Sequence, residues 1–350
     1  MITIRQIDAS KNKAFDDHEC VFAFSDTKAS LRGLIAWHNT KLGPATGGTR
    51  LFDYKNQKDA LTDVLRLSRA MSYKCALADV SFGGGKAVII GKKFTEPMMR
   101  SYAKIIDAFA GLYTTGTDVG VTDKNVLRMA KLTPYILKGN LGGKTTSFVA
   151  ALGVYHAFLA SVHFVFPKRS AEKITVAIKG LGKIGGELVA MLSRDGYTII
   201  VADPDVKKIR ALKKKFPKIT SVDTEKIFAL PADVYMPCAL GNEFTKNNIS
   251  KLACKIIVGG ANNQLEEQAL AVLLQKRGIV YIPDYVANAG GLIQIVDELG
   301  KNGYTTKRVE QKIRTIGTTV SRLLRNSKKK GVTPLALADA LARKKIFGTH

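Results

Sequence analysis

Two lysines in the first third of the chain have neighbours typical of groups that take part in chemistry. One ends the sequence Met71-Ser-Tyr-Lys74, and the other, Lys86, directly follows the three glycines 83–85. An ammonium group binds a carboxylate well, and a nearby cation or burial makes it lose its proton more easily. One lysine could therefore hold a carboxylate substrate while the other moves protons, with the glycines letting the backbone approach a ligand. The alternative is a pair of solvated surface lysines in a chain that has many.

A second motif has the pattern of a dinucleotide-binding turn, and it reads Gly180-Leu-Gly182-Lys183-Ile184-Gly185. It follows a predicted strand over 174–178 and precedes a predicted helix over 187–193. The first glycine permits the turn, the second lets a pyrophosphate approach the helix N-terminus, and the third allows close packing of helix on strand. We therefore predict a cofactor site here, against the alternative of a purely structural glycine turn.

The next predicted strand, over 198–202, ends at Asp203. Its carboxylate could accept hydrogen bonds from the adenosine ribose hydroxyls, and its charge would repel a 2′-phosphate, which favours NAD over NADP. The basic residues that follow could offset this repulsion: Lys207, Lys208 and Arg210. The alternative is a turn aspartate before Pro204.

The elements that position these residues predict an α/β protein of two domains. Residues 1–143 form a mixed α/β domain, with strands over 32–37 and 87–90 and a helix over 58–71. Residues 144–330 form a Rossmann-type, doubly wound NAD-binding domain, because strands alternate with helices. Its further strands are predicted over 234–235, 255–258 and 279–282.

Two helices and two hinges complete the predicted organisation. An amphipathic helix over 147–163 begins at a Thr or Ser cap and leads into the second domain. Gly331-Val-Thr333-Pro334 is a helix-start signal, and the C-terminal helix within 333–350 is expected to pack back on the first domain. Hinges are expected around Gly142-Gly143 and after Asp297.

The formal net charge of +25 raises the possibility of a nucleic-acid partner. The basic residues are dispersed, however, and the densest runs, 213–215 and 328–330, lie beside helical patterns where solvated faces are the commoner explanation. The four cysteines show no metal-ligand spacing, so we predict reduced thiols and no metal site. The N-terminus lacks the apolar core of a signal peptide and no apolar run approaches a membrane span, so we expect a cytoplasmic protein without a membrane partner.

Seven segments together resemble the glutamate, leucine, phenylalanine and valine dehydrogenase family, most of all its leucine dehydrogenases. They span nearly the whole chain: Leu42-Gly-Pro-Ala-Thr-Gly-Gly-Thr-Arg50, Met71-Ser-Tyr-Lys74, Gly83-Gly-Gly-Lys86, Thr117-Asp-Val-Gly120, Pro237-Cys-Ala-Leu-Gly241, Gly260-Ala-Asn-Asn-Gln-Leu265 and Pro283-Asp-Tyr-Val-Ala-Asn-Ala-Gly-Gly291. The resemblance implies NAD-dependent, reversible oxidative deamination of an L-amino acid to a 2-oxo acid and ammonia by a homo-oligomer. It also implies that the domain of residues 1–143 binds substrate and mediates oligomerisation, with a cleft between the two domains.

The resemblance also implies roles for residues that match the family. Lys74 would hold the substrate α-carboxylate, helped by Asn288. Lys86 would be the general base and acid that activates water, and Asp118 would relay protons and orient the ammonia. The cation at Lys74 is expected to lower the pKa of Lys86 towards the working range of a base. The nicotinamide end of the cofactor would be contacted by Asn262, Ala239 and Leu240.

The substrate pocket implied by the resemblance is mostly small or apolar. Glutamate-acting members carry a side-chain-binding lysine at a position that corresponds to Thr46, beside Gly47. The other pocket positions are Gly116, Leu292 and Ile295. This lining favours leucine, valine or isoleucine, although Gly116 could leave room for an aromatic ring.

One departure from the family is Ala150, where members usually have a threonine near the nicotinamide; Thr146 or Ser147 could substitute for it. This departure leaves room for a noncatalytic relative that binds NAD or nucleic acid. The closest enzymatic alternative, to which Gly116 points, is a phenylalanine or tryptophan dehydrogenase of the same family.

Overall fold

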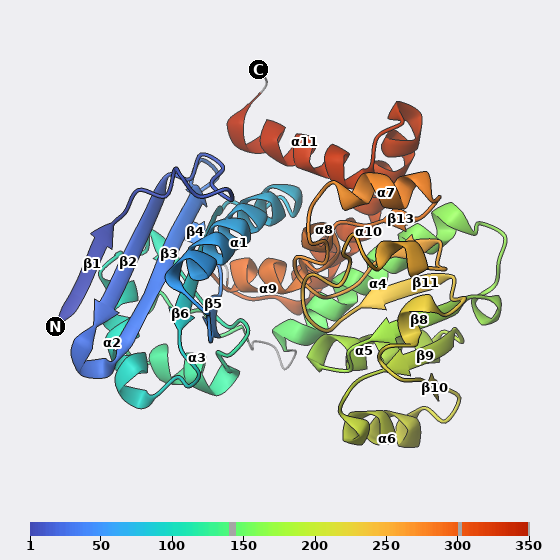
Figure 1. The fold of residues 1–350 in the computed structure, drawn as a ribbon, viewed down its shortest axis with the longest axis horizontal. Helices are drawn as coiled ribbons and strands as arrows, with labels where there is room; N and C mark the ends of the chain where they lie inside the picture. Colours follow the sequence, from blue (N-terminus) through green and yellow to red (C-terminus); the bar gives the residue numbers. More distant parts are fainter. Residues whose placement is uncertain (140–144, 300–302, 349–350) are drawn as a thin grey trace. The chain divides into compact units, whose positions relative to one another are not determined.

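The computed structural model describes residues 1–139, 145–299 and 303–348. The chain forms two compact units (Figure 1): unit 1 is Met1–Leu141 with Leu341–His350, and unit 2 is Gly142–Ala340. The predicted boundary after residue 143 and the predicted hinge at Gly142-Gly143 lie outside the described residues. Asp297 lies within a helix, and residues 300–302, just after that helix, are also outside the described part.

Unit 1 is built on a seven-stranded mixed sheet with the order β1-β2-β3-β6-β4-β7, in which β5 also pairs with β6. The β1–β2, β2–β3 and β3–β6 pairs are antiparallel and the others are parallel. The strands are β1 (Ile2–Gln6), β2 (Cys20–Asp26), β3 (Leu31–Asn39), β4 (Ala45–Thr46), β5 (Thr49–Phe52), β6 (Gly83–Ile90) and β7 (Tyr113–Thr114).

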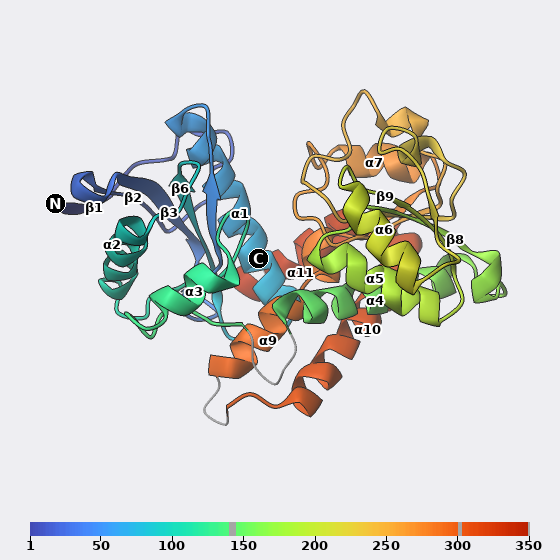
Figure 2. The ribbon, with the colours of Figure 1, turned by 90° about the horizontal axis from the view of Figure 1, so that it is seen from below.

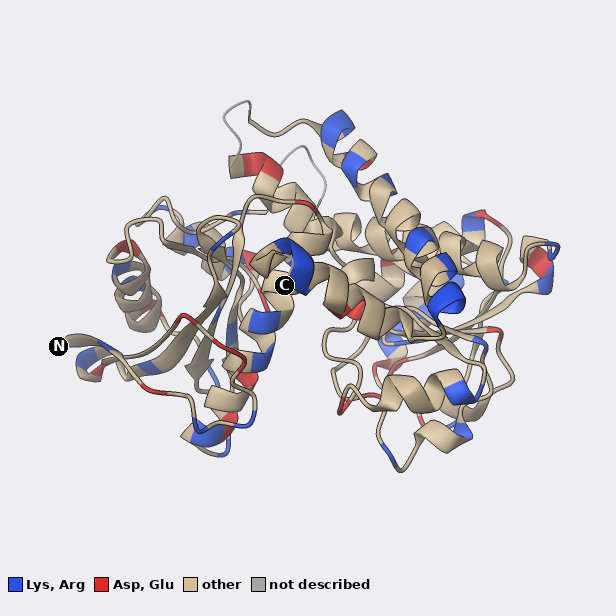
Figure 3. Cartoon of the chain, turned by 90° about the horizontal axis from the view of Figure 1, so that it is seen from above, with Lys and Arg blue, Asp and Glu red and all other residues tan. Residues whose placement is uncertain are grey.

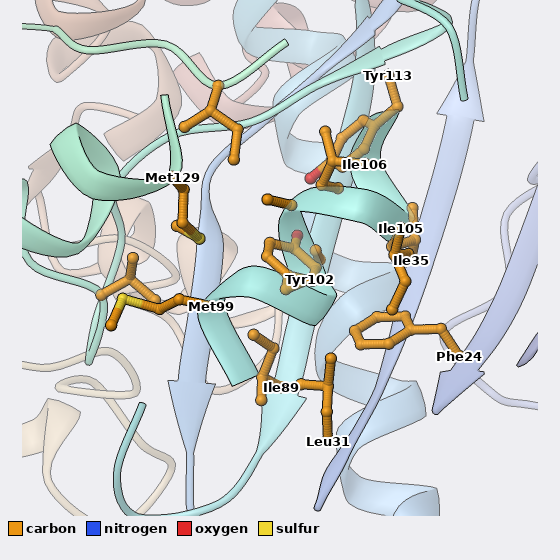
Figure 4. Close-up of a cluster of buried hydrophobic side chains, with 14 of the residues drawn as sticks. Phe24, Leu31, Ile35, Ile89, Met99, Tyr102, Ile105, Ile106, Tyr113 and Met129 are labelled. Atoms are coloured by element: carbon orange, nitrogen blue, oxygen red, sulfur yellow. The ribbon is translucent and has the colours of Figure 1, made fainter. Parts of the chain in front are cut away.

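Helices cover both faces of this sheet. Side chains alternate between the two faces along each strand, and the apolar ones on each face pack against helices. The helices of unit 1 are η1 (Thr27–Ala29), α1 (Gln57–Leu77), α2 (Glu96–Asp107) and α3 (Asp123–Met129). Leu34, Ala36 and Val88 pack against α1. Ile35 and Ile89 point to the other face, where they pack with Met99, Tyr102 and other residues of α2 (Figure 4). Figure 2 shows α1 and α2 on opposite sides of the strands.

Two predicted boundaries in unit 1 were wrong, and both affect the site. Helix α1 continues to Leu77, so Lys74 lies in its last turn. Strand β6 begins at Gly83, so the three glycines belong to the sheet. A Cβ at Gly84 would lie 2.1 Å from the Ser72 backbone nitrogen of α1, and one at Gly85 would lie 2.8 Å from the Tyr113 ring. These glycines therefore let β6 pack closely against α1 and Tyr113.

Unit 2 contains a six-stranded, fully parallel sheet with the order β10-β9-β8-β11-β12-β13. Numbered within the unit, this is the order 3-2-1-4-5-6 of dinucleotide-binding sheets, so the predicted Rossmann-type fold is confirmed. The strands are β8 (Thr175–Lys179), β9 (Thr198–Ala202), β10 (Thr220–Ser221), β11 (Val234–Pro237), β12 (Ile256–Ile257) and β13 (Val280–Tyr281).

The helices of unit 2 are α4 (Thr146–Val165), α5 (Lys183–Arg194), α6 (Val206–Lys215), α7 (Leu270–Lys276), α8 (Asp284–Ala287), α9 (Gly290–Leu299) and α10 (Thr306–Lys330), with the short η2 (Ala171–Lys173), η3 (Ile227–Ala229) and η4 (Ile249–Lys251). Helix α4 begins at the predicted kind of cap, since the Thr145 hydroxyl accepts a hydrogen bond from the Phe148 N–H. By length and composition alone α4 could span a membrane, so the expectation that no apolar run approaches that length was wrong. It packs against α5, α9 and α10, as a core helix does.

The last helix, α11 (Pro334–Phe347), begins at a Thr333 cap as predicted, with the Thr333 hydroxyl accepting from the Ala336 N–H. Its first half clusters with unit 2, and only the part from Leu341 clusters with unit 1. The expectation that the C-terminal helix packs on the first domain therefore holds for its second half. Lys345 donates to the Ala76 carbonyl at 3.0 Å and pairs with Asp79, which holds the end of α1.

Charged residues are spread over both units in the view of Figure 3, with lysine and arginine on helices and loops of each. Helix α6 buries none of its residues and carries a run of lysines, as expected of a solvated face.

Candidate active site

Lys86 and Asp118 form a buried ion pair in unit 1. The Lys86 Nζ lies 2.5 Å from the Asp118 Oδ2, and the two side chains are only 7% and 10% exposed. Lys86 lies opposite Ala36 in the β3–β6 register, on the sheet face that α1 covers. The structure therefore brings together the two residues to which the sequence assigned acid–base chemistry.

The loop that carries Asp118 is held beside β5 by backbone hydrogen bonds. The Thr49 N–H donates to the Gly116 carbonyl at 3.0 Å, and the Leu51 N–H donates to the Val119 carbonyl at 2.9 Å. Arg50 lies between these two donors, which places Asp118 next to it. The Asp118 Oδ1 also accepts the Val119 N–H at 2.7 Å.

Two cations face the Asp118 carboxylate. Burial alone would raise its pKa, but Lys86 and Arg50 outweigh burial and hold the pKa of Asp118 well below its usual range. The Arg50 Nε lies 3.6 Å from Asp118 Oδ2, and the Arg50 Nη1 lies 2.9 Å from Asp63 Oδ2. Sequence reasoning missed Arg50 and Asp63: Arg50 ends a family motif, but only the fold shows which carboxylates its guanidinium reaches.

Lys74 comes from α1, the helix that packs directly on β6. Thr46 and Gly47 lie beside the same strand, since β4 pairs with β6 and a Cβ at Gly47 would meet the Gly85 carbonyl oxygen. The Thr46 hydroxyl is buried and accepts a hydrogen bond from Thr114 at 2.9 Å. In unit 1 the predicted substrate residues therefore surround β6.

Gly116 lies on the loop that leads to Asp118 and is buried. A Cβ on Gly116 would lie 3.2 Å from the Leu137 carbonyl oxygen and 3.8 Å from the Leu137 Cβ, so Leu137 is its neighbour in unit 1.

The glycine-rich turn of unit 2 has the geometry that a pyrophosphate needs. Gly182 is the N-cap of α5 and has no side-chain cap, so N–H groups of the first turn remain available to an anion. A Cβ at Gly182 would meet nothing within 4 Å, whereas one at Gly185 would meet the Gly180 carbonyl oxygen at 1.9 Å. The second glycine therefore opens the turn, and the third lets helix pack on strand, as predicted. Lys183 and Ile184 begin α5 directly after it.

Asp203 directly follows β9, beside this turn. Its Oδ2 accepts the Leu181 N–H at 2.6 Å, its Oδ1 accepts the Asp205 N–H at 2.8 Å, and Lys208 Nζ lies 3.6 Å from Oδ1. The carboxylate thus braces the glycine turn from the position where an adenosine ribose would be recognised.

The remaining cofactor residues gather near the ends of β11 and β12. Ala239 and Leu240 follow β11 and are exposed, and a Cβ at Gly180 would lie 2.6 Å from the Ala239 nitrogen. Asn288 donates to the Asn262 side-chain oxygen at 2.8 Å and to the Gly260 carbonyl at 3.3 Å. Both N–H donors of Asn288 are therefore engaged within unit 2, and its buried Oδ1 has no partner among the described residues. A substrate carboxylate would have to displace one of these bonds, whereas the free oxygen suits a donor.

The last three positions lie on two packed helices. Leu292 is buried on α9 and Ile295 is half-buried on it. Ala150 of α4 lies against α9, because a Cβ at Gly290 would meet the Ala150 Cα at 3.3 Å. Within the described residues, no group of three or more His, Cys, Asp or Glu side chains could hold a metal ion.

A parallel sheet of this strand order, with a glycine-rich turn at the start of α5, defines the class of dinucleotide-binding α/β proteins. Residues 142–349 match the family model described as glutamate/leucine/phenylalanine/valine dehydrogenase, and residues 18–133 match that of its dimerisation domain. The chain belongs to this family, as the sequence predicted.

Its relatives carry several substrate names. It is 38% identical over 340 residues to a phenylalanine dehydrogenase of Caldalkalibacillus thermarum (strain TA2.A1), covering 94% of this chain and 91% of that protein. It is 37% identical to a leucine dehydrogenase of Bacillus subtilis (strain 168), covering 94% and 92%. Among solved structures it resembles the L-tryptophan dehydrogenase of Nostoc punctiforme, with 36% identity, a TM-score of 0.79 and coverage of 94% and 96%.

Proposed function

We propose that this protein catalyses the NAD-dependent, reversible oxidative deamination of an apolar L-amino acid to the 2-oxo acid and ammonia. The observation that carries the proposal is the buried Lys86–Asp118 pair in a chain whose other unit has a dinucleotide-binding turn. The proposed partners are small molecules, and the match to a dimerisation domain supports a homo-oligomer.

The chain's own residues would manage charge and protons. Lys74 would hold the α-carboxylate. Lys86 would accept a proton from the water that attacks the substrate carbon and return it to the amino nitrogen as ammonia leaves. Asp118, kept ionised by its two cations, would stabilise the ammonium form of Lys86 and orient the departing ammonia. When bound, the nicotinamide would accept a hydride from the substrate Cα.

The residues present fit such a cofactor. The open space at Gly182 and the uncapped start of α5 suit a pyrophosphate, and Asp203 suits the ribose hydroxyls. Ala239, Leu240 and Asn262 are exposed, and in this proposal they would contact the nicotinamide end.

Leucine, valine or isoleucine is the proposed substrate class, because Thr46 puts no cation where glutamate-acting relatives have a lysine, and Leu292 and Ile295 are apolar. The second candidate is phenylalanine or tryptophan, since dehydrogenases of both are among the relatives at 36% identity or more.

The test is initial velocity with NAD and a panel of L-amino acids, followed by nicotinamide absorbance. Turnover that favours branched-chain substrates is expected, and an aromatic preference would select the second candidate. NAD binding without turnover of any amino acid would contradict the proposal and indicate a noncatalytic relative.

A further inference from the structure

We propose that Arg50 is a positioning residue of the Lys86–Asp118 pair: it is a permanent cation that holds Asp118 in place and ionised while Lys86 gains and loses its proton. The inference rests on the proposed acid–base role of Lys86. It assigns control of the protonation of Lys86 to Arg50 and Asp63, the charged residues behind Asp118.

The Arg50 guanidinium bridges two carboxylates. Its Nε lies 3.6 Å from Asp118 Oδ2 and its Nη1 lies 2.9 Å from Asp63 Oδ2. The Tyr54 hydroxyl donates to the same Asp63 oxygen at 2.6 Å. Burial and the neighbouring Asp63 raise the pKa of Tyr54, so its hydroxyl stays a donor. Asp63 and Tyr54 thus hold Arg50, and Arg50 lies beside Asp118 as a counter-ion, without a hydrogen bond from its Nε to any of the described residues.

Charge balance explains why a second cation is needed. If Lys86 became neutral as the only partner of Asp118, a buried carboxylate would remain without a counter-ion, which is costly. Asp118 would then take up the proton that Lys86 released, and the pair would not function as a base. A guanidinium does not lose its proton in proteins, so Arg50 remains a counter-ion in both states of Lys86.

Arg50 and Asp63, which lie next to the pair, have opposite charges, so removing each charge should shift the protonation of the pair in opposite directions. Removing the charge of Arg50 should make proton loss from the pair harder, whereas removing the charge of Asp63 should make it easier. The other titratable groups named here stay unchanged in both variants. Burial and also the Asp118 charge raise the pKa of Tyr54, after β5, and of Tyr113, on β7, and Lys74 lies on α1, the helix that packs on β6.

The experiment measures kcat/KM against pH for the full-length protein and three variants. Arg50→Gln should move the acid limb of the profile to higher pH by about one unit or more, and Asp63→Asn should move it to lower pH. Arg50→Lys is the matched control: it should keep the limb near its original pH but lower kcat, because one ammonium cannot bridge both carboxylates. A merely structural role would lower rates or stability without opposite shifts, and unchanged limbs in Arg50→Gln and Asp63→Asn would overturn the proposal.

A second readout does not depend on turnover. The rate at which cyanate carbamylates Lys86, followed by mass spectrometry of the Lys86 peptide, rises as the lysine loses its proton. Its pH dependence should shift upward in Arg50→Gln and downward in Asp63→Asn. If the parent protein turned over no amino acid, the proposed function would fail, and these shifts alone would decide the role of Arg50. Fluorescence of the single tryptophan, Trp37, checks that unit 1 of each variant is folded. If Arg50→Gln does not fold, the shift in Asp63→Asn alone decides between the two outcomes.

Discussion

Each unit of the molecule holds a buried carboxylate beside its site, but the partners differ in kind. In unit 1, Asp118 meets the charged side chains of Lys86 and Arg50. In unit 2, Asp203 accepts two backbone N–H groups, from Leu181 and Asp205, and its nearest cation, Lys208, is 3.6 Å away. Side-chain cations make the first carboxylate sensitive to a change of protonation next to it. Backbone amides do not change charge between about pH 4 and 9, so the hydrogen bonds of the second carboxylate fix the conformation of the glycine turn and do not take part in proton transfer.

This difference predicts that chemistry and cofactor binding can be separated by mutation. Lys86→Ala should lower kcat by at least about 10³-fold, because proton transfer by a positioned group contributes 10²- to 10⁴-fold and Lys86 would serve in more than one step. Arg50 would still neutralise Asp118, so unit 1 should remain folded. Initial rates, together with an NAD titration, check both halves of the prediction.

The control for Lys86→Ala is Lys344→Ala, an exposed lysine on α11, which should leave the rates unchanged. Near-normal turnover in Lys86→Ala would remove Lys86 from the mechanism, and loss of NAD binding would show that the two sites are not separable.

Variants of the cofactor turn should lose stability or NAD binding through added side-chain volume, whereas variants at the Lys86–Asp118 pair should lose activity through changed charge. Gly185→Ala should lower the free energy of unfolding of unit 2 by about 3 kcal/mol or more, because its Cβ would overlap the Gly180 carbonyl oxygen. Gly182→Ala meets no neighbour and has a negative φ, so it should cost about 1 kcal/mol or less. It should nevertheless weaken NAD binding, because its methyl group would enter the space for the pyrophosphate. Thermal unfolding and NAD titrations of both variants test this, and equal losses of stability would contradict it.

The same contrast explains what the sequence could predict. The cofactor turn is local: strand, three glycines, helix and Asp203 follow one another within a single βαβ unit, so periodicity and glycine spacing were enough. The centre of unit 1 is assembled from β5, β6, α1 and the loop after β7. Lys86 and Asp118 were identified through family motifs, but Arg50 and Asp63 meet only because β5 lies parallel to β6 under α1.

The glycines before Lys86 show the limit of local reasoning. Three consecutive glycines indicate a loop by propensity, yet they form part of β6, because a side chain at Gly84 would collide with α1. Tertiary packing, which the sequence does not display, decided their conformation.

Acid should lower the free energy of unfolding of unit 1 through a buried histidine, His18, whose pKa is lowered in the folded state. The pKa of His18 is lowered from 6.5 to about 4, first by burial and then by the neighbouring His38. Its Nδ1 accepts the Asp16 N–H at 3.1 Å, a bond that protonation would break. Between pH 6.5 and 4 the unfolded chain therefore binds a proton that the folded unit does not, so stability falls as pH falls through this window. The loss should be on the order of 3 kcal/mol by pH 4.

Further acidification should act through Asp16 and Asp118, whose pKa values lie below the ordinary value in the folded state. Their contribution is present above the unfolded pKa near 3.8 and is lost as pH falls below it. Denaturant unfolding followed by Trp37 fluorescence, at intervals from pH 7 down to about pH 2, measures unit 1 alone and covers both windows. His18→Gln is the control, since it keeps a donor for the Leu65 carbonyl without a titrating ring, and it should flatten the curve above pH 4. A slope that persists in this variant would assign the effect to other groups.

Asp203 gives the smallest expected effect and the sharpest test of whether its carboxylate serves only the turn. Asp203→Ser should raise the ratio of kcat/KM with NADP to that with NAD by about tenfold, because a repulsive charge at the 2′-position is lost and Lys208 becomes free to meet a phosphate. Asp205→Ser is the matched control, since serine can still cap α6 through the Lys207 N–H and the ribose position is untouched. An unchanged ratio in Asp203→Ser, with lowered stability, would mean that Asp203 braces the glycine turn and does not read the ribose. A shifted ratio with little loss of stability would mean that its backbone hydrogen bonds position the carboxylate for the cofactor.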